Sequence, residues 1–96
     1  MKKEFLTNED IGEIEFQLEF YTDRRCEAIA YTSISADIAV FSNSGLDIVD
    51  FIISIIYKDG ELNCLNVYEI HGCNNLSLEK KISQALRKVG GLLWKR

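Results

Sequence analysis

Two apolar segments joined by Asp59-Gly60 constrain the fold of this chain more than any other feature. Asp-Gly is favoured in two-residue hairpin loops because both central residues adopt positive φ. With Lys58 set opposite Glu61, one face of the hairpin carries mostly apolar pairs: Tyr57–Leu62, Ile55–Cys64, Ile53–Asn66, Phe51–Tyr68 and Val49–Ile70. A shift of one residue would scramble both faces, so the pattern predicts a hairpin with this face in the core.

The other face of the hairpin pairs Ile56 with Asn63, Ser54 with Leu65, Ile52 with Val67 and Asp50 with Glu69. An alternative makes residues 47–57 a helix, with Ser44 and Asp47 as a capping box. Its apolar residues would cover every side of that helix, and four of them are β-branched isoleucines. We therefore favour a strand here, and the helical alternative stays open.

Polar and apolar residues alternate without a break over residues 13–20, which indicates a strand with one buried face. A helix competes, because Ile11, Ile14, Leu18 and Tyr21 are spaced three, four and three residues apart. Eight consecutive alternating residues and the preceding Gly12 favour the strand. A turn is expected at residues 22–25, and two further strands at 26–33 and 35–41.

The C-terminal region predicts an amphipathic helix. Its apolar stripe has helical spacing and consists of Leu78, Ile82, Ala85, Leu86, Val89 and Leu93. Gly90 is expected to end the helix. Residues 92–96 follow two glycines and contain three large apolar side chains, so they either fold back on the core or dock elsewhere.

These elements predict a single α+β domain over residues 1–96, with a mainly antiparallel sheet of about five strands and the C-terminal helix on one face. No segment approaches the roughly 20 apolar residues of a membrane span, and no apolar core of a signal peptide follows the N-terminus. Cys26, Cys64 and Cys73 form no disulfide framework. A reducing, cytoplasmic location is therefore expected.

Charge is unevenly distributed along the chain. Residues 1–75 contain 14 carboxylates and five basic side chains, a net charge of −9, whereas residues 76–96 have a net charge of +5. Such an asymmetry is typical of a protein that meets a positively charged partner. The basic segment is interleaved with the apolar stripe, which favours a solvated helix face over nucleic-acid binding.

One face of the predicted sheet combines carboxylates with apolar residues. If residues 14, 16, 18 and 20 face the helix, the candidate partner-binding residues on the open face are Glu13, Glu15, Glu19, Asp50, Glu69, Ile52, Leu65 and Val67. Asp50 and Glu69 would be directly opposite, a like-charge pair that a basic partner would offset. An acidic rim around an apolar centre is typical of a protein interface. The alternative is that these carboxylates only solubilise an exposed sheet.

Catalytic and cofactor motifs are not found in the sequence. His71, Cys73 and Cys64 lack the close ligand pairs of a zinc site, and the serines lack the glycines of a nucleophile elbow. Gly90-Gly91 ends a helix instead of starting one, so it is no phosphate loop. We expect no metal, no cofactor and no enzymatic activity.

In its small size, acidity, cytosolic thiols and lack of catalytic residues, the chain resembles the immunity proteins of bacterial toxin systems, including contact-dependent growth inhibition. The resemblance concerns general character and rests on no motif. It implies a basic protein partner, a toxin nuclease, neutralised by covering its active site or substrate cleft. The alternatives are a phage-encoded acidic mimic that inhibits a nucleic-acid-binding defence complex, and a regulatory or chaperone-like module that forms a homodimer through its open sheet.

Overall fold

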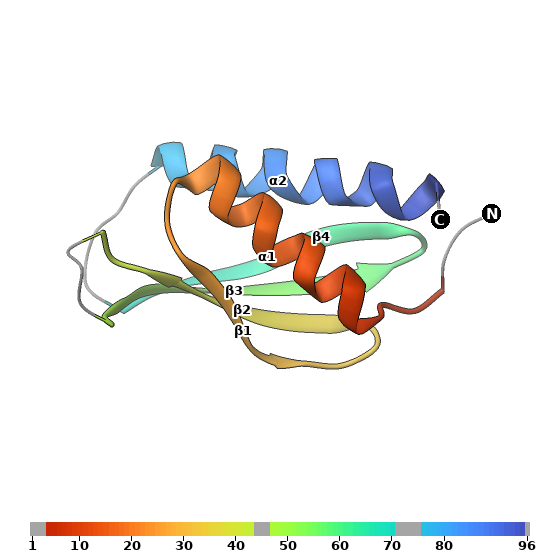
Figure 1. Ribbon diagram of the computed structural model, residues 1–96, viewed down its shortest axis with the longest axis horizontal. Helices are drawn as coiled ribbons and strands as arrows, with labels where there is room; N and C mark the ends of the chain where they lie inside the picture. The colour runs from red at the N-terminus through yellow and green to blue at the C-terminus, as the bar shows by residue number, and fades with distance from the viewer. Residues whose placement is uncertain (1–3, 44–46, 71–75, 96) are drawn as a thin grey trace.

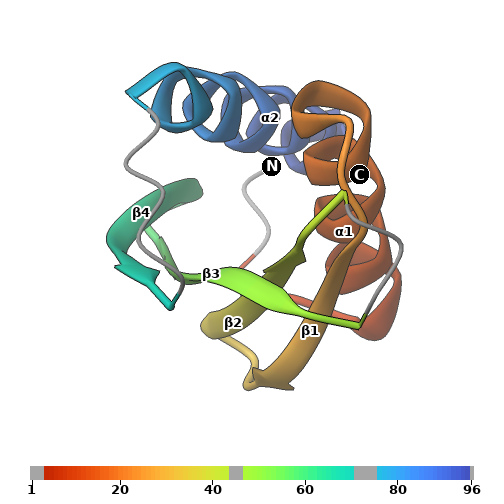
Figure 2. The ribbon, with the colours of Figure 1, turned by 90° about the vertical axis from the view of Figure 1, so that its left-hand side faces the viewer.

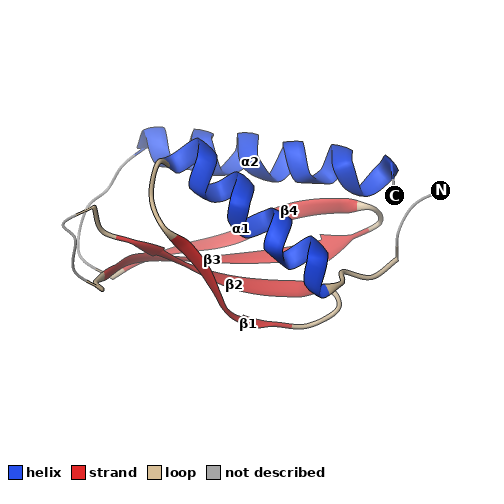
Figure 3. Ribbon diagram, viewed as in Figure 1, coloured by secondary structure: helices blue, strands red, loops and turns tan. Residues whose placement is uncertain are grey.

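The computed structural model describes residues 4–43, 47–70 and 76–95, which form one four-stranded antiparallel sheet and two helices (Figures 1 and 3). The elements follow one another as α1 (Asn8–Thr22), β1 (Cys26–Tyr31), β2 (Ser35–Phe41), β3 (Val49–Lys58), β4 (Glu61–Glu69) and α2 (Leu76–Lys95). The strands lie in the sheet in sequence order. Both helices lie on one face, α1 on the β1 side and α2 on the β4 side, and the opposite face carries neither helix (Figure 2). The α+β class is confirmed, with four strands in place of five.

The hairpin at Asp59-Gly60 is confirmed, with φ of 54° and 80° at the two turn residues. The predicted register holds from Lys58–Glu61 to Ile55–Cys64. Beyond this point it is wrong, because a bulge at Leu65 places Asn66 opposite Ser54 and moves every later pair by one residue. β3 also confirms the strand interpretation of this segment over the helical one.

The predicted N-terminal strand is wrong, since residues 13–20 lie within α1. The helix begins with a capping box, in which the Thr7 N–H donates to Asp10 Oδ2 at 2.8 Å and the Asp10 N–H donates to Thr7 Oγ1 at 3.3 Å. Ile11, Ile14 and Leu18 are buried. Their spacing is the helical one that competed with the polar–apolar alternation in the sequence.

The core fills the space between the helices and the sheet. Its largest fully buried side chains come from both helices and the two central strands: Ile14, Leu18, Ile38, Val40, Phe51, Ile53, Ile55, Ile82, Val89 and Leu93. Alternation along β3 buries Phe51, Ile53, Ile55 and Tyr57 beneath the helices, and leaves the residues between them on the bare face.

α2 continues through Gly90-Gly91 to Lys95, so the expected helix end at Gly90 is wrong. Glycine inside a helix costs about 1 kcal/mol relative to alanine. Leu93 lies beyond both glycines and is only 1% exposed, and burying a leucine contributes about 1.5–3 kcal/mol. The segment after the glycines therefore packs on the core as helix. The Trp94 side chain and residue 96 lie outside the described part of the chain.

Candidate functional site

The structure does not bring the eight predicted partner-binding residues onto one surface. Ile52 lies on the bare sheet face, and Leu65 is exposed at the bulge. Val67 and Glu69 pair with Ile53 and Phe51, whose side chains are buried beneath the helices, so they belong to the helix side of the edge strand. The three glutamates lie on α1 instead of on the sheet.

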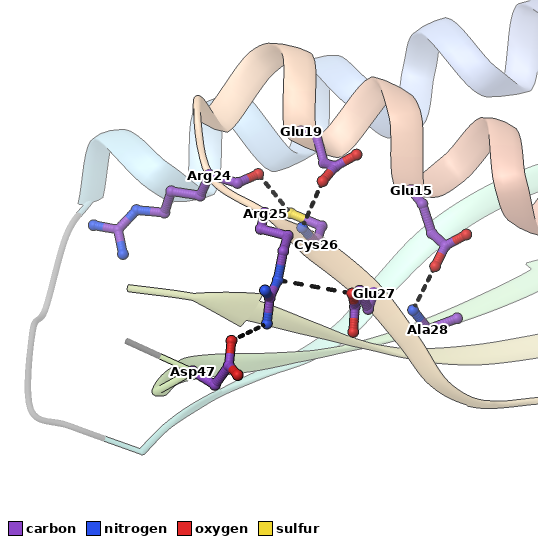
Figure 4. Close-up of polar contacts among 8 residues, drawn as sticks. All are labelled: Glu15, Glu19, Arg24, Arg25, Cys26, Glu27, Ala28 and Asp47. Atoms are coloured by element: carbon purple, nitrogen blue, oxygen red, sulfur yellow. Dashed lines mark hydrogen bonds and ion pairs between the residues drawn. The ribbon is translucent and has the colours of Figure 1, made fainter. Parts of the chain in front are cut away.

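Two of these glutamates close one edge of the sheet. The Glu15 carboxylate accepts a hydrogen bond from the Ala28 N–H at 2.8 Å, and that of Glu19 accepts one from the Cys26 N–H at 3.2 Å (Figure 4). Both N–H groups belong to β1, the edge strand beside α1. Glu15 and Glu19 thus occupy backbone donors that an edge strand would otherwise offer to another chain.

Asp50 and Glu69 are not cross-strand neighbours, because the bulge sets Glu69 opposite Phe51. Asp50 forms an ion pair with Arg24 at 2.8 Å, with side-chain exposures of 13% and 18%. The guanidinium of Arg24 also lies 5.8 Å from the Phe51 ring centroid. The like-charge repulsion expected from the sequence is therefore replaced by a mostly buried attraction.

A second arginine compensates the carboxylates near the start of β1. Arg25 forms an ion pair with Asp47 at 2.9 Å and approaches Glu27 at 3.7 Å (Figure 4). Its guanidinium carbon lies 3.9 Å from the centroid of the Phe41 ring. This end of the sheet is thus a mixture of charges and offers a basic partner little uncompensated negative potential.

The most exposed aromatic side chains of the described chain lie on the outer side of α1. Phe16 is 59% and Phe20 is 71% exposed. The two residues are four apart, so they are neighbours on the helix surface, and they lie roughly 200° around the helix from the buried Ile14 and Leu18. Neither belongs to the buried core, and the Phe20 ring meets the partly buried Tyr21 edge-to-face with 5.4 Å between the ring centroids.

Acidic side chains lie on the same side of α1, one and two turns before these phenylalanines. Glu9 and Glu13 share the outer side with Phe16 and Phe20 by helical spacing, and α1 contains no lysine or arginine. Glu13 Oε1 accepts a hydrogen bond from Gln17 Nε2 at 2.9 Å, which holds this carboxylate in place. We call Glu9, Glu13, Phe16 and Phe20 the α1 outer face. It combines carboxylates with exposed apolar side chains, a combination that the sequence had suggested for the sheet.

The two described thiols differ in their surroundings. Cys26 is buried in β1, and burial raises the pKa of its thiol to about 11. Cys64 in β4 is exposed, and partial desolvation raises its pKa as well. Neither thiol has the lowered pKa of an activated nucleophile.

In residues 4–43, 47–70 and 76–95 no three His, Cys, Asp or Glu side chains cluster as metal ligands would. His71 and Cys73 lie outside these ranges. No helix in the described part of the chain combines the length and apolarity that a membrane crossing requires. Searches with protein-family models, curated proteins and solved structures found no match to this chain.

Proposed function

We propose that this protein is a non-catalytic binding protein that docks a basic protein partner through the α1 outer face. The observation that carries the proposal is the exposure of Phe16 and Phe20 on the side of α1 opposite the core. Burying a phenylalanine that was exposed contributes about 1.5–3 kcal/mol. Aromatic residues, phenylalanine among them, are enriched in the cores of protein interfaces.

The charge of the partner follows from the charges around the anchors. The charged residues of α1 are all acidic, and Glu13 is an i,i+3 neighbour of Phe16, with Glu9 one turn further toward the N-terminus. A positively charged surface would be drawn to this helix and held in register by it. An immunity protein that covers the active site or substrate cleft of a basic toxin nuclease fits this description.

The two alternative functions fit the α1 outer face less well. A mimic of nucleic acid acts on a site built for phosphates, and the two phenylalanines contribute nothing to that charge match. A homodimer through this face would place the glutamates of two α1 helices against each other, at a cost in like-charge repulsion. A basic partner with an apolar depression satisfies both the phenylalanines and the glutamates.

The test compares the double variant Phe16→Ala/Phe20→Ala with a matched control, Leu65→Ala/Tyr68→Ala. The control removes two side chains of similar exposure, 63% and 51%, from β4. Proteins that co-purify with the tagged wild-type chain from its native host supply the candidate partner, and purified components are then titrated by calorimetry. We expect the α1 variant to lose about 100-fold or more in affinity, as for interface anchors, and the control to bind normally.

Association rates at low and high salt complete the test. The rate should fall steeply with added salt, because salt screens attraction between an acidic helix and a basic partner. A partner that binds the Phe16→Ala/Phe20→Ala variant as tightly as the wild type would refute the α1 outer face as the docking surface. A salt-independent association rate would refute the basic partner.

A further inference from the structure

Among the described residues, the outer edge of β4 has no backbone partner, in contrast to the edge of β1, where α1 accepts two hydrogen bonds. The Lys58–Glu61 pair closes the two-residue turn, and the alternation of an antiparallel ladder then directs the backbone groups of Leu62 and Cys64 outward, away from β3. Within residues 4–43, 47–70 and 76–95, β3 is the only strand whose backbone pairs with β4. Such an edge is a template for another extended chain.

A groove runs between this edge and α2. One part, of about 480 Å³, is lined by Leu62 and Cys64 of β4 and by Ser83, Leu86 and Arg87 of α2. A second part, of about 330 Å³, is lined by Cys64, Asn66 and Val67 with Glu79, Ile82 and Ser83. The two parts share Cys64 and Ser83, so they follow each other along β4. From Leu62 to Val67 the strand extends roughly 17 Å, the length of a short peptide strand.

The α2 wall of the groove carries opposite charges at its two ends. Arg87 lines the part beside Leu62, and Glu79 lines the part beside Val67. Neither side chain forms an ion pair with a described residue. They are eight residues apart, roughly 12 Å along the helix. Positions i and i+4 of an extended peptide point to the same side and are separated by a similar distance, roughly 13 Å.

We propose that this groove binds an extended peptide segment that adds to β4 as an antiparallel fifth strand. The segment has a basic residue facing Glu79, an apolar residue two positions later facing Cys64, and an acidic residue two positions later facing Arg87. Main-chain hydrogen bonds to Leu62 and Cys64 provide affinity, and the alternate side chains provide specificity. We choose the antiparallel direction because antiparallel pairs outnumber parallel ones and are slightly more stable.

A second copy of this chain fits the β4 edge less well. Antiparallel self-pairing about Leu65 would place Glu61 of one copy opposite Glu69 of the other. It would also bring together two α2 helices whose exposed faces carry Lys80, Lys81, Arg87 and Lys88. The bulge at Leu65 interrupts the regular pairing that a symmetric strand pair needs.

The probe is the peptide acetyl-Thr-Lys-Thr-Val-Thr-Glu-Thr-amide, titrated to millimolar concentration into the full chain carrying Cys73→Ser. Backbone amide shifts by NMR report the position of the peptide, and the rate of Cys64 alkylation by iodoacetamide reports occupancy of the groove. We expect shifts concentrated at residues 62–67 and 79–87, and alkylation slowed several-fold at saturation. Absence of binding at millimolar peptide would overturn the proposal.

Three matched controls distinguish backbone pairing and charge complementarity from nonspecific binding of the peptide. The reversed peptide acetyl-Thr-Glu-Thr-Val-Thr-Lys-Thr-amide should bind at least about fivefold more weakly, and N-methylation of the valine, which removes its N–H donor, should abolish binding. In the charge-swapped variant Glu79→Lys/Arg87→Glu the preference between the two peptides should reverse. Equal binding of the two peptides, or an unchanged preference in the swapped variant, would overturn the charge assignment.

This groove is distinct from the α1 outer face, and the proposal does not rest on the proposed function. Phe16→Ala/Phe20→Ala should leave peptide binding unchanged, so failure of one proposal is distinguishable from failure of the other. Sedimentation of the peptide-free protein gives the last outcome. A dimer in which the amides of Leu62 and Cys64 are protected from hydrogen exchange would overturn the peptide-binding proposal and would assign the groove to a second copy of the chain.

Discussion

The two edges of this sheet lie beside two helices on the same face, yet among the described residues two N–H groups of one edge are capped by its helix and the other edge is open. At the β1 edge, Glu15 and Glu19 of α1 accept hydrogen bonds from outward-pointing N–H groups of the strand. At the β4 edge, α2 presents Ser83 and Arg87 at the same four-residue spacing, across a groove. Arginine donates hydrogen bonds and cannot accept them, so it cannot cap strand N–H groups.

This difference shows that an adjacent helix does not by itself protect an edge strand. Protection requires acceptors of the right length at positions that face the strand. Arg87 could donate only to outward carbonyl groups of β4, and the described residues show no such hydrogen bond. Four predictions test this comparison.

The largest expected effect concerns the two described cysteines, one at each edge. In a Cys73→Ser background, we expect iodoacetamide at pH 8 to alkylate Cys64 at least on the order of 100-fold faster than Cys26. Cys26 is buried, and burial raises the pKa of its thiol, whereas Cys64 is exposed. Mass spectrometry of proteolytic fragments measures both rates. Similar rates would show that the β1 edge opens as readily as the β4 edge.

Removing the two carboxylates that close β1 should destabilise the protein. Glu15→Ala/Glu19→Ala should lower the free energy of unfolding by roughly 1–3 kcal/mol, since two charge-assisted hydrogen bonds to β1 are lost. Urea unfolding measures the change. Glu13→Ala is the control, because it removes one negative charge from α1 but only a side-chain contact with Gln17. An equal effect per glutamate would mean that charge, and not the capping of the strand, is responsible.

The ion pair that ties Arg24 to β3 should contribute less. Asp50→Asn should reduce the free energy of unfolding by about 1 kcal/mol, because a mostly buried charge-assisted hydrogen bond is weakened. Asp47→Asn, whose side chain is 84% exposed beside Arg25, should change it by less than about 0.5 kcal/mol. Thermal unfolding of the two variants decides the comparison. A gain in stability for Asp50→Asn would support the like-charge repulsion expected from the sequence.

The smallest effect is expected in α2, the helix beside the open edge. A Cβ added at Gly91 would meet nothing within 4 Å, so Gly91→Ala should raise the free energy of unfolding by about 0.5–1 kcal/mol through helix propensity. Gly90→Ala should stabilise by a similar amount, and it also places a methyl group in the groove wall. Peptide binding should therefore weaken for Gly90→Ala and not for Gly91→Ala. Equal peptide affinities in the two variants would contradict the proposed position of the peptide.

The sequence predicts the antiparallel sheet and α2 well, because these elements follow local rules. Asp59-Gly60 suits a turn with two positive φ angles, and a 3.6-residue apolar period specifies α2. The bulge at Leu65 could not be predicted, since nothing in the local composition marks where a ladder skips a residue. The extension of α2 past two glycines also depends on a tertiary contact, the burial of Leu93.

The wrong prediction of a strand over residues 13–20, which lie in α1, has a different cause, and that cause is related to the proposed function. The polar–apolar alternation over residues 13–20 is complete only because Phe16 and Phe20 are apolar residues on the solvent side of the helix. Had they been polar, the helical spacing would have stood alone. Phe16 and Phe20, the anchors of the proposed interface, are thus the residues that made α1 look like a strand in the sequence. Conflict between a local pattern and the fold is expected at functional sites.

The arrangement of α1 and α2 side by side has a consequence for motion before contact. One helix exposes acidic groups and its neighbour exposes Lys80, Lys81, Arg87 and Lys88, so the pair acts as an electric dipole directed across the two axes. In the field of a cationic surface such a dipole experiences a torque as well as an attraction. The molecule would rotate during its approach until α1 leads and α2 trails. Orientation would then be selected while the two surfaces are still separated by solvent.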